Sequence, residues 1–327
     1  MKYRKLGRTG LDISEISLGT WQVGGGWGGS FDPKVADEII KTALEHGVNF
    51  LDTADVYDDQ QSERKVGEYV KADRDKLIIA TKIGRRLNPH EADAYTPEAL
   101  EDFVDQALVN TGLDYLDLVQ LHCPPTPVYE FQEVFSKLEE IRASGKVRHF
   151  GVSVEKVEEA EMAASYEVVE SVQIIFNMFR QKPSEKIFDL LHERGIGIIA
   201  RVPLASGLLS GKMSANMKFD PNDHRHFNRN GEVFDKGETF SGVPLDLGLK
   251  AAAELKELFG DDHLYKYALK WILGFPQVST VIPGASRPEQ VIANIQASQL
   301  PDFNSDQMQT VRKIYEEYIK EEVHHLW

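Results

Sequence analysis

The stretch LIIATK, residues 77–82, is a short apolar run that ends in a lysine. Apolar runs of this length are typical of strands that are buried on both faces of a sheet. A lysine directly after such a run needs a partner for its charge, or it loses its proton. The residues that end similar runs elsewhere in the chain therefore bear on both the fold and the chemistry.

Eight such runs are spaced along the chain, and amphipathic helical patterns fill most of the gaps between them. The predicted strands are 16–18, 49–51, 77–81, 116–121, 147–152, 171–175, 197–202 and 278–282, with helical patterns over 33–46, 99–109, 131–142 and 288–297. Alternating strands and helices predict a parallel sheet of the α/β class. Eight repeats in this length predict a closed (β/α)8 barrel, the TIM barrel.

The two ends of the chain add elements to this barrel. Residues 3–6 and 12–14 flank the turn GRTG and predict an N-terminal β-hairpin, and 305–322 predict an extra C-terminal helix. Residues 214–244 form a long polar segment, and a loop of that size within a compact domain is usually a lid or disordered. We find no linker composition, so residues 1–327 are predicted to form a single domain.

The amino-acid composition limits the classes of partner that the protein is expected to bind. Lys and Arg number 37 against 52 for Asp and Glu, a formal net charge of −15. Such an acidic surface repels phosphate backbones, so no nucleic-acid partner is expected. No apolar run approaches the roughly 20 residues of a membrane helix, so no membrane partner is expected. The one cysteine, Cys123, excludes an intrachain disulfide and favours a cytoplasmic location. The oligomeric state stays open, with a monomer as the default.

Four residues suited to acid–base chemistry stand at or near three neighbouring strand ends. Asp52 ends the second predicted strand and Tyr57 follows five residues later, while Lys82 and His122 end the third and fourth strands. The carboxyl ends of barrel strands meet on one rim, where active sites lie. Singly, these residues have ordinary structural explanations, such as a loop cap, half-buried packing or a rim histidine. Together they predict a catalytic set.

This set suits the reduction of a carbonyl group. A carbonyl that accepts a hydride develops negative charge on its oxygen and must be protonated. We predict that Tyr57 donates this proton, and that the Lys82 cation lowers the tyrosine pKa from its usual value of about 10. Asp52 would hold the lysine in place, and His122 would hydrogen-bond the carbonyl oxygen. The hydride itself must come from a cofactor, because no side chain supplies one.

A set of short motifs extends over nearly the whole chain. These are LGTW (18–21), FLDTA (50–54) with Tyr57, TK (81–82), LH (121–122), GVS (151–153), PL (203–204), GL (207–208), GK (211–212) and VIPG (281–284). In this order they resemble the aldo-keto reductase family. The chain is most similar to the bacterial branch with the general-stress reductases and more distantly to potassium-channel β subunits. The resemblance implies the barrel, the four catalytic roles and NADPH-dependent reduction of aldehydes and ketones to alcohols.

The resemblance also implies a cofactor site along the carboxyl ends of the strands. It places the nicotinamide near Asp52, with Ser153 and Gln173 on its carboxamide. The other contacts expected are Gly19, Thr20, Trp21, Arg201, Pro203, Leu204, Ser206, Gly207, Leu208, Ser210, Lys212, Gly284, Ala285, Ser286, Arg287, Gln290 and Asn294.

Two segments of that site suit phosphates. The loop 203–212 offers backbone amides and a lysine for a pyrophosphate. Ser286 and Arg287 open the last barrel helix, where they suit a 2′-phosphate. NADPH is therefore favoured over NADH.

Two positions depart from the family pattern: Val154 follows Ser153 where relatives often have a polar residue, and Arg201 stands at the end of the seventh strand. Many relatives stack an aromatic ring on the nicotinamide from the end of the seventh strand, where this chain has Arg201. A guanidinium also stacks on a planar ring. Its charge would be unfavourable beside the cationic oxidised cofactor, which predicts a bias toward the reduced form. The substrate itself is expected to contact rim loops around Trp21, Trp27, Tyr129 and Phe179.

Three alternative interpretations compete with this one. Gly24, Gly26 and Gly29, followed by Asp52, mimic the dinucleotide fingerprint of a Rossmann domain. The fingerprint glycines should form the turn between strand and helix directly, but residues 30–32 still separate them from Pro33, which disfavours this fold.

The other two alternatives concern function. Channel β subunits suggest a nicotinamide-binding redox sensor with slow turnover, but His122 stands where those relatives tend to have asparagine, which favours an enzyme. His224 and His226 with His122 or His263 suggest a metal site. Histidine spacing in a polar loop is weak support, and no metal is expected.

Overall fold

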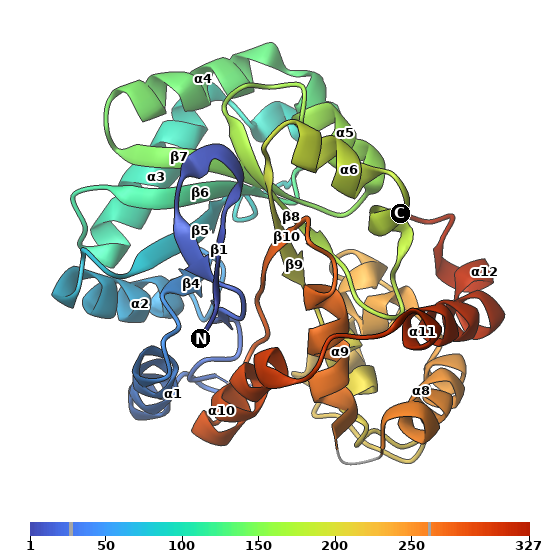
Figure 1. Cartoon of the computed structure of the whole chain (residues 1–327). Coiled ribbons are helices and arrows are strands. Elements are labelled where there is room, and N and C mark those ends of the chain that lie inside the picture. The colour runs from blue at the N-terminus through green and yellow to red at the C-terminus, as the bar shows by residue number, and fades with distance from the viewer. Residues whose placement is uncertain (26–28, 261–262) are drawn as a thin grey trace.

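The structure is a computed structural model that describes residues 1–25, 29–260 and 263–327. Within these ranges, eight parallel strands lie side by side in chain order (Figure 1). They are β3 (Leu18–Gly19), β4 (Phe50–Asp52), β5 (Ile78–Ile83), β6 (Leu116–His122), β7 (Val147–Val154), β8 (Val169–Ile175), β9 (Gly197–Arg201) and β10 (Val278–Val281). The Ser17 N–H donates to the Val281 carbonyl (2.9 Å), and the Val281 N–H donates to the Glu15 carbonyl (3.0 Å). These bonds link the first strand to the last and close the sheet, which confirms the predicted (β/α)8 barrel.

The strands β4 to β7 each run one or two residues further than the sequence predicts. β4 includes Asp52, β5 includes Lys82 and β6 includes His122. In the parallel register, Asp52 pairs with Ala80, and Lys82 pairs with Gln120. The candidate catalytic side chains therefore project from regular strands, which position them more precisely than loops would.

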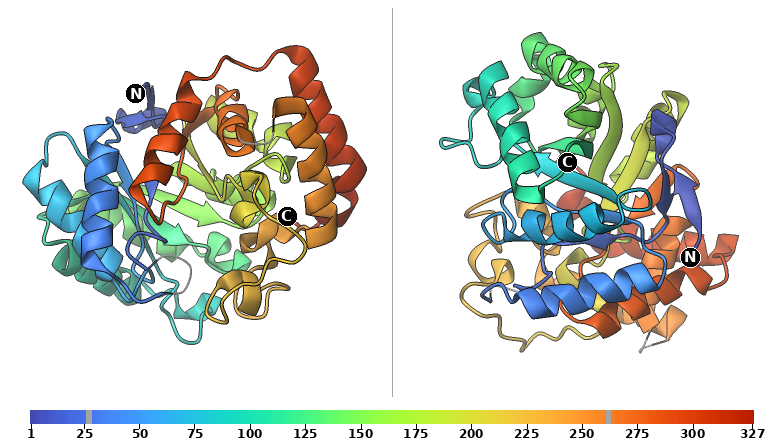
Figure 2. Two further views of the ribbon diagram at one scale, coloured as in Figure 1. Left: turned by 90° about the horizontal axis from the view of Figure 1, so that it is seen from below. Right: turned by 90° about the vertical axis from the view of Figure 1, so that its left-hand side faces the viewer.

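Helices surround the barrel on its outside, as both views in Figure 2 show. They are α1 (Pro33–Glu45), α2 (Gln61–Ala72), α3 (Pro97–Thr111), α4 (Gln132–Ala143), α5 (Val157–Ala163), α6 (Ile187–Glu193), α7 (His224–Phe227), α8 (Leu245–Phe259), α9 (Leu264–Leu273), α10 (Pro288–Gln296), α11 (Ser305–Tyr318) and α12 (Lys320–Val323). Asp32 and Thr96 cap α1 and α3 through their side-chain oxygens, each directly before an N1 proline. The predicted last helix is split into α11 and α12 at Ile319. None of the described helices is long and apolar enough to cross a membrane.

The predicted N-terminal hairpin covers the amino end of the barrel. β1 (Tyr3–Lys5) and β2 (Asp12–Ser14) pair in antiparallel fashion, and Leu6 and Ile13 are fully buried in one cluster with residues of the barrel interior. Leu6 lies so close to Gly197 that a Cβ there would come within 2.5 Å of its Cδ1 atom. This end of the barrel is therefore plugged by side chains, and the carboxyl ends of the strands remain available for a site. The closed barrel also excludes the Rossmann alternative, although Gly26 lies outside the described residues.

Candidate active site

The four residues of the predicted catalytic set meet at the carboxyl ends of β4, β5 and β6. Lys82 Nζ lies 2.5 Å from Asp52 Oδ1 and donates hydrogen bonds to the Thr53 carbonyl (2.9 Å) and to the Tyr57 hydroxyl oxygen (3.3 Å). The rings of Tyr57 and His122 meet edge to face, with centroids 6.1 Å apart. The structure therefore brings the four side chains into one contiguous group.

The Asp52–Lys82 ion pair is almost completely buried, with side-chain exposures of 2% and 1%. Gln173 donates a hydrogen bond to Asp52 Oδ2 (2.8 Å), and Gln120 donates a longer one to the same oxygen (3.3 Å). These amides satisfy the carboxylate oxygen that Lys82 leaves free, as a buried charge requires. Sequence reasoning missed Gln120, although a glutamine within the apolar run LDLVQLH was a signal for an inward-facing polar group.

A chain of hydroxyl groups fixes the backbone next to this pair. Thr53 donates to Ser62 (3.0 Å), Ser62 donates to Thr20 (2.7 Å), and Thr20 donates to the Asp52 carbonyl oxygen (3.0 Å). Ser62 and Thr20 come from α2 and from the segment after β3. These bonds tie three separate segments to the position of Asp52.

Burial and charge set the protonation states of the site. Burial raises the pKa of Tyr57 above its ordinary 10.0, and the attraction of Lys82 for the phenolate offsets only part of this rise. The prediction that Lys82 brings this pKa below its usual value was therefore wrong, because desolvation outweighs the lysine. Burial lowers the pKa of Lys82, but Asp52 and Tyr57 more than reverse this, so the ammonium stays charged. The pKa of His122 falls well below 6.5 through burial and the nearby cations Arg85 and Lys82. The imidazole is therefore neutral.

A cavity of about 550 Å³ runs from this group along the carboxyl ends of the strands. Tyr57 and His122 line one part of it. Of the predicted cofactor residues, it is lined by Gly19, Thr20, Trp21, Asp52, Gln173, Arg201, Pro203, Leu204, Ser206, Gly207, Ser210, Lys212, Gly284, Arg287, Gln290 and Asn294. The predicted Ser153, Leu208, Ala285 and Ser286 do not line it. Ser153 lies 3.5 Å from the Cys123 sulfur, and Ser286 donates to Gln290 (2.7 Å from its backbone nitrogen).

The far part of the cavity has the donors that a dinucleotide needs. Among the described residues, the Lys212 ammonium and the Arg287 guanidinium make no hydrogen bond or ion pair within the chain. The loop η5 (Ala205–Ser210) beside them has Ser206 and Gly207 in the left-handed region (φ 52° and 101°), so its backbone makes a tight curve. Unpaired cations and a curved glycine loop match the phosphates of a nicotinamide dinucleotide.

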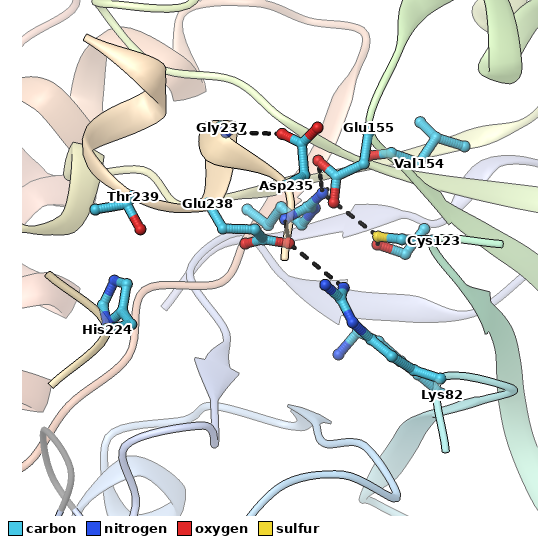
Figure 3. Close-up of polar contacts among 12 residues, drawn as sticks. Lys82, Cys123, Val154, Glu155, His224, Asp235, Gly237, Glu238 and Thr239 are labelled. Carbon is cyan, nitrogen blue, oxygen red and sulfur yellow. Dashed lines mark hydrogen bonds and ion pairs between the residues drawn. The ribbon is translucent and has the colours of Figure 1, made fainter. Parts of the chain in front are cut away.

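Arg201 lies in a buried network of charges rather than in an open position. Its guanidinium forms ion pairs with Glu238 (2.6 Å) and Glu155 (3.0 Å), and it donates to the Val154 carbonyl (3.0 Å). In Figure 3, Glu238 points from its loop toward Glu155 and Cys123. Because two carboxylates balance Arg201, the predicted bias toward the reduced cofactor loses its electrostatic basis.

This network of charges also bears on the alternative interpretation of the sequence as containing a metal site. Among the described residues, the group of metal-ligand types close enough to share an ion is Cys123, Glu155 and Glu238. Arg201 contacts all three, including the Cys123 sulfur at 3.6 Å, so a guanidinium already supplies the positive charge there. His224, from the predicted histidine motif, is not part of this group.

The long polar segment 214–244 is folded over the site. It contains α7 and the short turns η6 (Lys236–Glu238) and η7 (Phe240–Gly242). Ser206 of the glycine loop donates to the Glu238 carbonyl (3.0 Å), and Trp327 donates to Asp235 (3.0 Å). Glu238 thereby lines the cavity. Its role was not visible in the sequence, because no strand or helix pattern fixes its position.

The predicted substrate pocket is only partly correct. Trp21 lines the cavity. Tyr129 and Phe179, in contrast, are buried in the hydrophobic core, with exposures of 2% and 0%. Trp27 lies outside the described residues. Aromatic composition alone does not separate a rim side chain from one that packs beneath the rim.

Comparisons with known proteins agree with this geometry. A model of the aldo/keto reductase family matches residues 15–316. The chain is 30% identical to the aldo-keto reductase YhdN of Bacillus subtilis, over 99% of this chain and 96% of that protein. It is 29% identical to a putative voltage-gated potassium channel subunit beta of Schizosaccharomyces pombe, over 92% and 89%. An aldo-keto reductase from Bacillus halodurans in its holo form superposes with a TM-score of 0.77 at 27% identity, covering 96% of each chain.

Because Asp52 and Lys82 form a buried ion pair, we expect substitutions of the two residues to have coupled effects on the free energy of unfolding. Asp52→Asn leaves Lys82 charged without its partner, so we expect the free energy of unfolding to fall by about 3–5 kcal/mol. Urea denaturation of Asp52→Asn, Lys82→Met and the double variant checks this. The double variant should lose less than the sum of the two single losses, because no unpaired charge remains. Additive losses would show that the pair is not coupled.

Proposed function

The chain belongs to the aldo/keto reductase family, and we propose that it reduces aldehydes and ketones to alcohols with NADPH, with Tyr57 as the proton donor. Members of this family are NAD(P)H-dependent oxidoreductases that act on small carbonyl compounds. The observation that carries the proposal is the contact of Lys82 with both Asp52 and Tyr57 at the end of a cavity.

This contact prepares Tyr57 to act as an acid. Because the Lys82 ammonium donates its hydrogen bond to the phenolic oxygen, the phenolic hydrogen is left to point into the cavity. The same ammonium stabilises the phenolate that forms when that proton leaves. Asp52 keeps Lys82 charged, so the tyrosine faces a fixed positive charge throughout.

His122 is suited to hold the carbonyl oxygen. A neutral imidazole has one N–H donor and one acceptor nitrogen. Its low pKa excludes a competing acid at this position, so His122 donates a hydrogen bond while Tyr57 supplies the proton. Oriented donors of this kind stabilise negative charge as it develops on oxygen.

The cofactor supplies the hydride when it is bound. Gln173 and Asp52 border the proposed nicotinamide end of the cavity, and Lys212 and Arg287 border the proposed phosphate end. The unpaired Arg287 supports NADPH over NADH, because a 2′-phosphate gives it a charged partner. Four of the predicted cofactor residues do not line the cavity, and we propose that they act on the cofactor indirectly, by holding residues that do line it. The four are Ser153, Leu208, Ala285 and Ser286. We still predict that the protein is a monomer, that residues 1–327 form a single domain and that its location is cytoplasmic.

We expect Tyr57→Phe to lower kcat for aldehyde reduction by about 10²- to 10⁴-fold, the usual contribution of a general acid. NADPH binding, measured by fluorescence titration, should persist. Tyr115→Phe is the matched control, because Tyr115 precedes β6 at the other end of the barrel, beneath Arg74. If Tyr57→Phe retained full activity, the proton donor would be another group.

Single-turnover kinetics separate an enzyme from a redox sensor. Stopped-flow absorbance of NADPH mixed with aldehydes, ketones and sugars measures single-turnover hydride transfer. A transfer that is very slow with every carbonyl compound would point to the sensor.

The protonation states predict a flat pH profile for reduction. His122 stays neutral from well below pH 6.5, and Tyr57 keeps its proton beyond pH 10.0. With saturating aldehyde and NADPH, kcat should be constant between these limits and should fall above the upper one as Tyr57 loses its proton. A steep transition near neutral pH that follows substitution of His122 would contradict a neutral imidazole.

Arg287→Ala tests the cofactor preference. Loss of a charge-assisted hydrogen bond to the 2′-phosphate should raise the Kd of NADPH about 10- to 100-fold. The Kd of NADH should change little. Calorimetry with both cofactors gives the two values, and Arg312→Ala on the exposed face of α11 serves as the control. If the substitution raised the Kd of NADPH and of NADH equally, Arg287 would not be the residue that binds the 2′-phosphate.

A further inference from the structure

Arg85 is a half-buried guanidinium that the proposed mechanism does not use. It lies two residues beyond β5, the strand that carries Lys82, and its side chain is 21% exposed. Its contacts with described residues are an ion pair to Glu238 at 3.8 Å and the ring of Phe234 at 5.6 Å. It donates no hydrogen bond to any described residue. Because part of the side chain is exposed, its N–H donors are accessible to a partner from outside the chain.

The neighbouring guanidinium groups of Arg201 and Arg180 donate hydrogen bonds to described residues, whereas that of Arg85 does not. Arg201 is held by Glu238, Glu155 and a backbone carbonyl at 2.6–3.0 Å. Arg180 donates to the Glu155 carbonyl and stacks on Trp327. Glu238 is therefore committed mainly to Arg201, which is closer to it than Arg85 is.

Arg85 also lies close to the proposed reaction centre. Glu238, its ion-pair partner, lines the same cavity as Tyr57 and His122. After burial, the charge of Arg85 is the largest influence that lowers the pKa of His122. Arg85 itself does not line that cavity, so it would act at its border, beside the cavity-lining Glu238.

The charges around Arg85 favour an incoming anion. The described groups around Arg85 and its neighbours include Arg180, Arg201, Glu155, Asp235, Glu238 and Cys123, together with His90, Tyr95 and His122. Burial raises the pKa of Glu155 to about 7, so its carboxyl is partly protonated near neutral pH. Burial alone would raise the pKa of Glu238, but Arg201 and Arg85 hold it at about 2. Arg85 and Arg201 thus share the ionised carboxylate of Glu238, and Glu155 beside Arg201 carries only part of a charge.

We propose that Arg85 binds a carboxylate of the substrate, so that the chain reduces oxo acids, which carry a carbonyl and a carboxylate on one small molecule. The inference rests on the proposed carbonyl reduction and names its substrate class. The planar guanidinium presents paired N–H groups that match the two oxygens of a carboxylate. A phosphate dianion fits less well, because the ionised Glu238 at 3.8 Å repels a second negative charge.

The test compares oxo acids with uncharged aldehydes of matched length. The pairs are glyoxylate with acetaldehyde, 4-oxobutanoate with butanal, and 4-carboxybenzaldehyde with 4-methylbenzaldehyde. In the wild-type chain, kcat/KM should favour at least one acid over its partner. Arg85→Gln should lower that ratio about 10- to 100-fold, as expected for a lost charge-assisted hydrogen bond, while the uncharged aldehydes change little. Arg85→Lys should restore part of the ratio.

Arg148→Gln is the control with the same change of charge. Arg148 lies at the amino end of β7, where it is exposed and stacks on Tyr115. The ratio should be unchanged in this variant. An equal effect of the two substitutions, or a ratio that Arg85→Gln leaves intact, would overturn the proposal. A preference for glyceraldehyde 3-phosphate over glyceraldehyde that depends on Arg85 would replace the carboxylate by a phosphate.

A binding experiment keeps this inference separate from catalysis. Calorimetry with 4-hydroxybutanoate, the product of 4-oxobutanoate reduction, should show binding to the NADP⁺ complex of the wild-type chain and a loss of about 10-fold or more in Arg85→Gln. If the wild-type chain reduced uncharged aldehydes but bound no carboxylate, the Arg85 proposal would fail and the proposed function would stand. If it bound the carboxylate but reduced no carbonyl compound, the proposed function would fail instead.

Discussion

The site depends on one buried ion pair, that of Lys82 with Asp52. Two charges inside a barrel are costly to desolvate, and the cost is offset only when each charge has close, well-oriented partners. Asp52 has Lys82 on one oxygen and the amides of Gln173 and Gln120 on the other. Lys82 has Asp52, a backbone carbonyl and the oxygen of Tyr57. The partners come from β4, β5, β6 and β8 and from one loop, so the barrel register and the position of Tyr57 are linked through this pair.

Much of this arrangement was predictable from the sequence, for a physical reason. Strands buried on both faces appear as short apolar runs, and charged residues at their ends stand out against that background. Asp52, Lys82 and His122 were found in this way. The strand bounds are less accurate, since the predicted strands stop just before Asp52, Lys82 and His122, whereas the strands of the structure include these residues.

The rest of the site could not be predicted, because it depends on tertiary position rather than on local pattern. Glu238 comes from a long irregular segment whose path is set by contacts with Ser206 and Trp327. It converts Arg201 from an apparently isolated charge into a member of a balanced network. The sign of the Tyr57 pKa shift was wrong for a similar reason: adjacent charges can be inferred from a sequence, but the extent of burial cannot. Tyr129 and Phe179 likewise needed the structure to place them in the core.

Direct transfer of hydrogen from the cofactor to a carbonyl carbon is the central claim of this account. Reduced NADP with both C4 hydrogens of the nicotinamide replaced by deuterium, mixed with an aldehyde and excess protein in ordinary water, tests it in a single turnover. We expect an alcohol with one deuterium on the former carbonyl carbon and a hydroxyl proton from solvent, as nuclear magnetic resonance would show. An alcohol without deuterium, or no alcohol at all with any carbonyl compound, would contradict it.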